Sequence, residues 1–413
     1  MEQARSRLPL AALVAAVAAV AATLILRPRG GLIEPSAVDV EAYFSPEQLE
    51  RARDFRDPQR LLGFAGLAVT GGTLALLALR PPRLVERFER RPLLGAAVAG
   101  AGISVVLVGA TLPLAAVGHE RAVNVGLSTQ DWAPWLGDVA KAAGVEAVLA
   151  AGGGALFLAL VRRFRQRWWL PAAACAVGLG VASLWLFPVV IDPLFNRFDP
   201  LEQGALRSEV LALASEAGVE VGEVYSVDAS RRTTGVNAYV GGLGSTKRVV
   251  LYDNLIERFP PEQVRSVVAH ELAHQKHRDL WRGLLWLAFV APAATLLAQR
   301  LAERLDRRAG LADRSRQPGP AALPVLVLSL ALVSFALGSA SNALSRQVEA
   351  RADAFALRLA GDPAAFIALE RRLALANVSD PDPPALLHAL FGTHPTTVER
   401  IGIGESWARG AGR

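Results

Sequence analysis

Cysteine is nearly absent from this sequence, whose 413 residues include only one, Cys175. A single cysteine cannot form an intramolecular disulfide, and it cannot build a zinc site from thiolates. Histidine is also scarce, with six in the chain. Any metal ion held by this chain must therefore be bound by a small number of histidine and carboxylate side chains.

Charged residues are few as well. They make up 20% of the chain against 52% hydrophobic residues, whereas soluble domains average about a quarter charged. The apolar residues gather in segments about as long as a helix needs to cross a ~30 Å hydrocarbon layer. These segments are 8–26, 61–79, 93–117, 142–161, 169–191, 281–298 and 321–340, of which 142–161 is the weakest because it contains Glu146. Because only helices satisfy every backbone polar group within lipid, we predict a bundle of seven transmembrane helices.

The first apolar segment has a second interpretation, a cleaved signal peptide. Arg5 and Arg7 precede it, and small residues follow. However, its apolar stretch is longer than a usual signal core, and Arg27 and Arg29 close it as they would close a retained anchor. We therefore expect the segment to be retained as a membrane anchor.

Basic patches interleaved with aromatic residues are missing, and so are repeats of fixed period. The formal net charge of +6 comes mainly from arginine, which clusters at 83–91, 162–167 and 300–316. These clusters lie beside the apolar segments, where basic residues meet lipid head groups. The partner predicted for these charges is the lipid bilayer and not nucleic acid.

Two polar stretches, 192–280 and 344–413, are separated by two apolar segments and must lie on the same side of the membrane. We therefore predict an N-terminal membrane domain, residues 1–191, with five transmembrane helices. The second domain, residues 192–413, is interrupted by the last two. In the polar loop 30–60, Ser45 can cap a short surface helix that begins at Pro46.

Within the second domain, a helix is expected over 203–218 and a strand over 219–227. The runs 236–240 and 248–252 are rich in β-prone residues, and a glycine-rich connection joins them as a hairpin. Residues 261–277 begin with proline and carry valine and leucine at helical spacing, which predicts a helix.

Residues 270–274 read HELAH and match the H-E-x-x-H pattern. On the predicted helix, the i,i+4 spacing places His270 and His274 on one face, a turn apart and within reach of a single Zn²⁺. The helical repeat rotates Glu271 by about 100° from His270, so its carboxylate lies beside the metal position and can accept a proton from water. Because such a trio can also arise by chance on an exposed helix, the interpretation requires a third ligand.

Glu349, in the stretch SRQVEARADAFALRLAG after the last apolar segment, is the candidate third ligand. Asp353 lies one helical turn further, so one face can supply both a ligand and a carboxylate that holds a ligand imidazole. Spacing alone leaves an alternative of equal weight. In that alternative, Glu349 and Asp353 only form ion pairs with neighbouring arginines on a solvated face.

The other histidines carry weaker arguments. His277 shares the face of His270 but lies two turns away, too far to join the same tetrahedral ion. His394, in THPTTVERI, is by itself more often structural than catalytic. His119 and His388 have no sequence neighbours that suggest a function.

A peptide substrate must be held extended for its carbonyl to meet the metal. An edge strand can do this by accepting the substrate as an additional strand. The run 236–240 is the candidate edge, with Asn237 as an anchor. An asparagine that only serves a turn before a strand explains the same residue equally well.

Seven stretches share a resemblance to one family. In chain order they are YFSPEQLERAR, DPLFNRFDPLEQGALRSEV, SRRTTGVNAYVGGLG, RVVLYDNL, VVAHELAHQKHRD, SRQVEARADAFA and THPTTVERI. Together they resemble the type I CaaX prenyl proteases and their bacterial relatives, which are multi-pass membrane zinc metallopeptidases. The resemblance covers nearly the whole chain. It implies a mainly α fold, in which seven helices enclose a chamber and a small α+β gluzincin-like domain carries one Zn²⁺.

The resemblance also implies roles for residues of the site. His270 and His274 match the histidine ligands of the family, Glu349 matches its third ligand, and Glu271 matches its catalytic acid/base. One departure is Gly235, where relatives often carry a histidine before the Asn-Ala-Tyr run. This departure concerns only the details of substrate contact.

Further residues match the family outside the ligand set. Asp353 matches the acid that supports a ligand, and His394 matches the late histidine that steadies the oxyanion of the reaction. Asn237 and Tyr239 belong to the substrate-side strand, and Arg400 matches the arginine that ends the last stretch. We predict that these last three contact the substrate.

The combined prediction is an integral-membrane zinc metalloendopeptidase that acts on a peptide or protein substrate, with CaaX-type processing as the expected activity. Three alternatives remain: a heat-shock-type quality-control protease, an intramembrane-cleaving metalloprotease, and a zinc-binding membrane scaffold without turnover. Charged neighbours of HELAH such as Arg265 and Lys276 oppose intramembrane cleavage, and the intact Glu271 opposes the scaffold.

Membrane orientation is left open by two arguments that disagree. We expect a plasma-membrane protein, and the resemblance implies that its catalytic side faces the cytoplasm. However, the loops 80–92, 162–167 and 299–320 carry most of the flanking arginine and lie on the opposite side. The preference of basic loops for the cytoplasm would therefore place the catalytic side outside.

Overall fold

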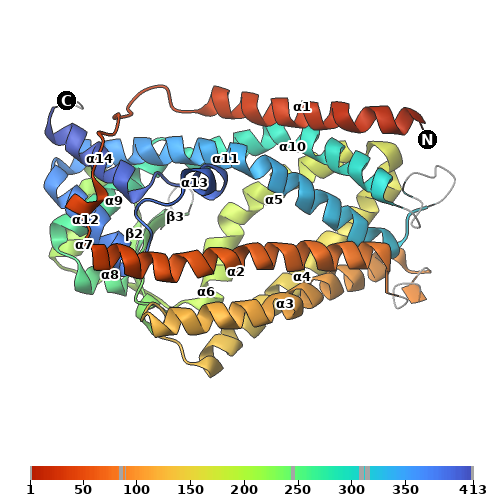
Figure 1. The fold of residues 1–413 in the computed structure, drawn as a ribbon, viewed down its shortest axis with the longest axis horizontal. Coiled ribbons are helices and arrows are strands. Elements are labelled where there is room, and N and C mark those ends of the chain that lie inside the picture. Colours follow the sequence, from red (N-terminus) through yellow and green to blue (C-terminus); the bar gives the residue numbers. More distant parts are fainter. Residues whose placement is uncertain are drawn as a thin grey trace.

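Seven long apolar helices make up most of the molecule. The computed structural model describes residues 2–82, 87–88, 90–242, 247–306, 311 and 317–410. Its described part contains seven helices that are long and apolar enough to cross a membrane, as the sequence predicts. They are α1 (Glu2–Leu26), α2 (Pro46–Leu79), α3 (Pro92–Asn124), α4 (Trp132–Phe164), α5 (Trp169–Leu186), α10 (Asp279–Leu305) and α11 (Leu323–Ala360). Figure 1 shows these helices running along the long axis, with the shorter helices and the sheet at one end.

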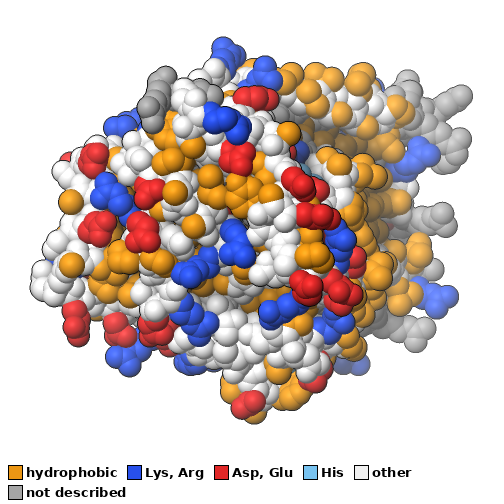
Figure 2. Space-filling model, turned by 60° about the vertical axis from the view of Figure 1, so that its left-hand side comes forward, with side chains coloured by type: hydrophobic (Ala, Val, Ile, Leu, Met, Phe, Trp, Pro, Cys, Tyr) orange, Lys and Arg blue, Asp and Glu red, His pale blue; other side chains and the backbone are white. Residues whose placement is uncertain are grey.

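The surface of the molecule divides in the same way. Figure 2 shows acidic and basic side chains mixed over the end that carries the sheet, while hydrophobic side chains dominate the helices that recede from it. Exposed hydrophobic residues along the helices include Leu67, Leu76, Val105, Leu149 and Phe289. A face of this kind fits lipid, and the mixed charged end fits water.

The prediction of a short surface helix after Ser45 is wrong in one respect. Ser45 does cap a helix, and its side chain accepts a hydrogen bond from the N–H of Gln48. That helix does not end in the loop but continues as α2 to Leu79. No glycine interrupts residues 46–60, and neither Asp57 nor Pro58 breaks the helix, so the polar turns and the membrane segment form one element.

Small residues allow close packing between α3 and α4. A Cβ placed on Gly100 would lie 2.2 Å from the C=O of Ala150, and one on Gly154 would lie 2.7 Å from the C=O of Ala96. Such close backbone approach is typical of helix pairs in membranes. The first helix is also packed into the bundle, where α1 contacts α10 and α11.

A four-stranded sheet lies at the polar end. The strands are β1 (Phe198–Pro200), β2 (Glu223–Val227), β3 (Ala238–Gly241) and β4 (Arg248–Tyr252), in the order β1-β2-β4-β3. β2 and β4 are parallel, and the other two pairs are antiparallel. The hairpin of β3 and β4 is confirmed, although part of its glycine-rich connection, 243–246, lies outside the described residues. β3 is an edge strand.

The first strand predicted in this domain, 219–227, is shorter than expected. Gly218 ends the preceding helix, α7 (Ala205–Ala217), in a left-handed conformation with φ of 66°. Residues 219–222 then form a connection, and β2 begins only at Glu223. Residues 219–222 alternate in hydrophobicity like a strand, but they form the bend that follows the glycine at the end of α7.

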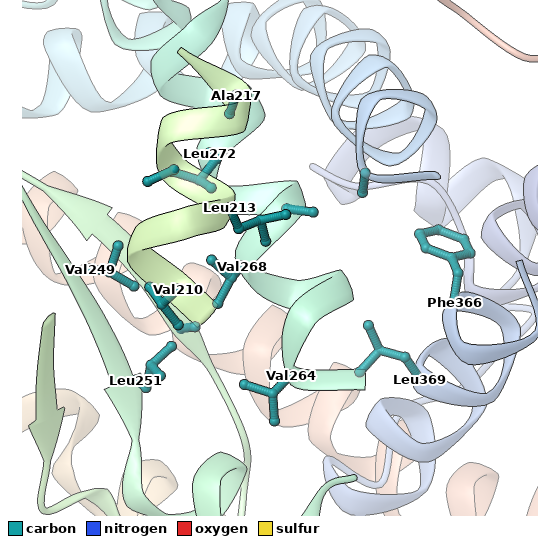
Figure 3. Packing of buried hydrophobic residues seen from close by; sticks show 14 of the residues in the cluster. Val210, Leu213, Ala217, Val249, Leu251, Val264, Val268, Leu272, Phe366 and Leu369 are labelled. Carbon is teal, nitrogen blue, oxygen red and sulfur yellow. The ribbon is translucent and has the colours of Figure 1, made fainter. Parts of the chain in front are cut away.

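A hydrophobic core fixes the helix that carries HELAH. This helix is α9 (Pro261–Lys276), which starts with proline at its first position as predicted. Its residues Val264, Val268 and Leu272 pack against Val210 and Leu213 of α7 (Figure 3). Because these positions form one face of the helix, the opposite face with its histidines is directed away from this core.

The remaining short elements lie at the polar end, except the 3₁₀ turns Arg165–Arg167 and Pro320–Ala322, which lie at the opposite end of the membrane helices. They are α6 (Asp192–Phe195), α8 (Asp253–Arg258), α12 (Pro363–Ala376), α13 (Ala385–Phe391) and α14 (Thr397–Ala408), the π-helical turn Phe187–Ile191, and the 3₁₀ turns Val40–Ala42, Arg165–Arg167, Ala229–Arg231 and Pro320–Ala322. The loop after α1 lies against α14, where the N–H of Ser36 donates to the C=O of Gly402 at 3.1 Å. The N-terminal loop thus holds the last helix in place.

Candidate metal centre

The two histidines of HELAH face each other at short range. His270 Nε2 and His274 Nε2 are 3.3 Å apart, and their ring centroids are separated by 5.0 Å. α9 is not one of the seven candidate membrane helices of the described chain. HELAH therefore lies outside the seven candidate membrane helices and at the polar end of the molecule, which does not favour the intramembrane-cleaving alternative.

Glu349 completes a set of three donor groups. It lies on α11, the helix that continues the last membrane segment, and is 9% exposed. Its Oε2 is 3.1 Å from His270 Nε2, and its Oε1 is 3.7 Å from His274 Nε2. A tetrahedral ion with ligands at ~2.0–2.1 Å holds its ligand atoms about 3.3 Å apart. The three side chains therefore fit a divalent metal ion in both donor chemistry and spacing, so Glu349 is not limited to ion pairs with arginines on a solvated face.

Glu271 belongs to the same cluster. Donor atoms of His270, Glu271 and His274 lie within 4.8 Å of one another. Burial raises the pKa of Glu271 above its ordinary value, and the two neighbouring imidazoles partly oppose this shift. A carboxylate with a raised pKa beside a metal position is suited to accept and return a proton.

A buried chain of charged groups begins at Nδ1 of His270, the ring nitrogen that does not face Glu349. Asp353 is fully buried, and its Oδ1 lies 2.8 Å from His270 Nδ1. Arg400 donates through Nε to Asp353 Oδ2 at 2.9 Å, and its Nη1 lies 2.7 Å from Oε2 of Glu370. Burial raises the pKa of Glu370, although Arg400 lowers it. The predicted pairing of Asp353 with a ligand imidazole is present, and Arg400 is held between two carboxylates.

His274 has a matching support that the sequence reasoning missed. Its Nδ1 lies 3.2 Å from Oδ2 of Asp279, and Arg351 donates to the other oxygen of Asp279. Asp279 is the first residue of α10, five positions after His274. The nearby acid was visible in HELAHQKHRD, but only the fold shows that the chain reverses between α9 and α10 and brings it to the imidazole.

His394 reaches the cluster from the loop between α13 and α14. Its Nε2 lies 3.5 Å from Oε2 of Glu349, and its side chain is 59% exposed. His388 donates from Nε2 to the C=O of His394 at 2.8 Å, a contact that the sequence did not suggest. The other two histidines lie apart from these: His277 packs edge-on against Phe355, and His119 stacks on Trp135.

A cavity of about 340 Å³ opens beside these groups. It is bordered by the start of β3, by α9, by α12 and by the loop to α14; its lining includes Asn237, His270, Glu271, Leu369, Asn377 and His394. Asn237 is exposed, and its Oδ1 accepts from the N–H of Ala238 at 2.9 Å. Tyr239 donates to Oδ2 of Asp192 at 3.2 Å. The cavity is wide enough for substrate side chains next to the histidine pair.

Comparison with known proteins agrees with this geometry. The family model described as "Peptidase family M48" matches residues 200–407. A second family model, "CAAX prenyl protease N-terminal, five membrane helices", matches residues 123–197. The two matches are separated by only two residues and together include β2, β3, β4, α9, α11 and nearly all of α14.

Similar proteins and one solved structure point the same way. The "Uncharacterized metalloprotease YhfN" of Bacillus subtilis (strain 168) is 32% identical over 300 residues, which cover 72% of this chain and 70% of the relative. A "CAAX prenyl protease 1 homolog" of Oryza sativa subsp. japonica is 33% identical over 234 residues, 54% of this chain and 52% of that protein. The crystal structure of S. mikatae Ste24p shares the fold, with a TM-score of 0.71, 19% identity, and coverage of 95% of this chain and 98% of that one. The chain therefore belongs to peptidase family M48 and is a multi-pass membrane metalloprotease.

Proposed function

We propose that this chain is a zinc endopeptidase in which His270, His274 and Glu349 hold one Zn²⁺. The supporting observation is the spacing of their donor atoms, 3.1 to 3.7 Å, which suits a tetrahedral ion. Two imidazoles and one carboxylate form the ligand set of many zinc peptidases, which keep a fourth position open. The single cysteine, Cys175, lies on α5 and takes no part.

The chemistry can be assigned to this chain's own groups. When bound, Zn²⁺ would supply Lewis acidity, polarising a peptide carbonyl and lowering the pKa of water. Glu271 would accept the proton of the attacking water and return it to the departing amine nitrogen. His394 would donate a hydrogen bond to the oxyanion that develops on the substrate. Both side chains lie at the cavity, as these roles require.

The groups behind the ligands would act through them. Asp353 fixes the tautomer and the ring orientation of His270, and Asp279 does the same for His274. Arg400 in turn holds Asp353. Because Arg400 is shared by two buried carboxylates, we assign it a positioning role; direct contact with the substrate, as the sequence predicted, stays a prediction.

We propose that the substrate is a peptide segment bound as an additional strand on β3. Asn237 and Tyr239 lie on or beside that strand, and the cavity next to it reaches His270 and Glu271. The CAAX prenyl protease 1 homologues among the relatives favour prenylated C-terminal peptides as the substrate class over misfolded membrane proteins. A chamber enclosed by the seven helices would supply room for a prenyl chain.

Metal removal should abolish peptide cleavage by the purified protein in detergent. A chelator that removes the ion leaves Glu271 without an activated water, and the rate should fall to background. One equivalent of Zn²⁺ per chain should restore it. Metal analysis and cleavage of a farnesylated CaaX peptide, measured on the same samples, test this expectation. Full activity in a protein shown to contain no zinc would contradict the proposal.

We also propose a plasma-membrane location with the polar end in the cytoplasm. The likeness to prenyl proteases supports this side, while the arginines at 162–167 lie at the opposite end of the helices. A cysteine introduced at Arg409, which is exposed, should react with an impermeant maleimide only after cells are opened. Cys175 would first be replaced by serine. If position 409 reacts in intact cells, the polar end faces the outside and the proposed orientation is wrong.

A further inference from the structure

The open side of β3 is defined by the direction of its backbone groups. Successive residues of a strand direct their N–H and C=O groups to alternate sides. The N–H of Tyr252 donates to the C=O of Asn237 at 3.2 Å, so Asn237 faces β4. The backbone groups of Val236, Ala238 and Val240 therefore face away from the sheet. These are the groups to which an added strand would bond.

Side-chain amides already occupy both ends of this edge. Oδ1 of Asn377 accepts from the N–H of Val236 at 3.0 Å, and its Nδ2 donates to the C=O of Val236 at 3.4 Å. At the other end, Nε2 of Gln275 donates to the C=O of Val240 at 3.1 Å. Between them, no amide side chain of the described residues engages the C=O of Ala238 or the N–H of Val240. The edge that remains open is therefore short.

The backbone around Asn377 turns its side chain toward β3. Asn377 is the C-cap residue of α12, and the next residue, Val378, has a φ of 46°. Glycine or asparagine usually takes this left-handed position at a helix end, and a β-branched residue is unfavourable there. Arg56 of α2 holds the turn by donating to the C=O of Val378 at 2.7 Å and to the C=O of Asn377. In this turn, the side-chain amide of Asn377 bonds the backbone of Val236.

Gly235 provides the space for this amide. A Cβ at position 235 would lie 2.9 Å from Oδ1 of Asn377 and 3.0 Å from Oγ1 of Thr233. A side chain at 235 would thus displace the amide from Val236. The pairing of Asn377 with Val236 therefore depends on glycine at position 235.

We propose that the side-chain amide of Asn377 ends the pairing of the substrate strand with β3, and we call this amide the stop. The inference rests on the proposed function, in which the substrate pairs with β3. Because Asn377 satisfies both backbone groups of Val236, a bound peptide can pair with the C=O of Ala238 and the N–H of Val240 but not with Val236. Asn377 lies in the wall of the cavity that also contains Glu271, so the stop is close to the scissile bond. It limits how many residues the cleft accepts on one side of that bond.

The test compares wild type with Asn377→Ala on a series of synthetic peptides. The series shares one core sequence and is extended residue by residue, first at one end and then at the other. We expect kcat/KM of the wild type to fall once the chain at one end passes the stop. In Asn377→Ala, the ratio of kcat/KM for extended and short peptides at that end should rise about tenfold, because two backbone hydrogen bonds become available to the substrate. Mass spectrometry of the products identifies the cleavage position.

Two further variants guard against a folding artefact. Asn377→Asp keeps the shape and the acceptor but cannot donate to the C=O of Val236, and it should raise the ratio partway. Gln59→Ala removes an amide that donates to the C=O of Gly118, between α2 and α3, and should leave the ratio unchanged. The thermal unfolding midpoint of each protein is measured in the same detergent.

The outcomes separate the stop from the enzyme activity. An unchanged ratio in both Asn377 variants, with zinc-dependent cleavage intact, overturns the stop and leaves the proposed function standing. Equal changes at both ends of the peptide would also overturn the stop, since Asn377 bonds only one end of the open edge. If the zinc-loaded wild type cleaves no peptide, the proposed function fails and the stop fails with it.

Discussion

Glu271→Gln is expected to lower kcat for peptide cleavage by at least about a thousandfold while the zinc content stays at one per chain. The amide has nearly the shape of the carboxylate but cannot accept a proton from water. The proposed ligands His270, His274 and Glu349 are untouched, and Asp353 and Asp279 remain bonded to the imidazoles. Metal analysis and single-turnover cleavage of the same preparation separate the two quantities.

The matched control for this variant is Glu262→Gln on the same helix. Glu262 lies in the first turn of α9 and is exposed, so its replacement changes the net charge by the same amount at a position away from the cavity. Its kcat should be close to that of wild type. Retained turnover in Glu271→Gln would remove the assignment of Glu271 as the base, and loss of zinc in that variant would indicate a ligand role instead.

Much of the fold could be predicted because its signals are local in sequence. The seven membrane helices follow from the length of apolar runs, and α9 follows from proline at 261 and the spacing of Val264, Val268 and Leu272. The i,i+4 spacing of His270 and His274 also fixes their relation on any helix. In these elements, the residues whose spacing gives the prediction are the same residues that pack or pair in the structure.

Asp353 was predicted from its spacing to Glu349, but other groups around the site could not be predicted in this way. Glu370 and Asn377 belong to the segment of α12, where no motif distinguishes them from other polar residues of a surface helix. Their partners Arg400 and Val236 are distant in sequence, so the contacts exist only after α12 has packed against α14 and α9. The continuity of α2 was missed for a different reason, since a polar stretch was interpreted as a separate element although no helix stop divides it from the span.

Arg400→Met is expected to destabilise the folded protein by about 3–5 kcal/mol. The guanidinium lies between Asp353, which is 0% exposed, and Glu370, which is 2% exposed. Removing it leaves two carboxylates close together and away from water, without a counter-charge. Asp353 would also lose the group that orients it toward His270, so zinc affinity should fall by about 10–100-fold. Unfolding in mixed micelles and competition with a zinc chelator measure the two effects.

Arg409→Met provides the comparison within the same part of the chain. Arg409 pairs with Glu405 at 3.3 Å, but its side chain is 60% exposed, and such surface pairs contribute at most about 1 kcal/mol. Adding Glu370→Gln to Arg400→Met should recover part of the lost stability, because one of the two stranded charges is then neutral. Recovery of stability without recovery of zinc affinity is the expected pattern, since Asp353 would still lack its arginine. If Arg400→Met were as stable as Arg409→Met and bound zinc as tightly as wild type, the buried chain from Glu370 to His270 would have no role in holding the metal site.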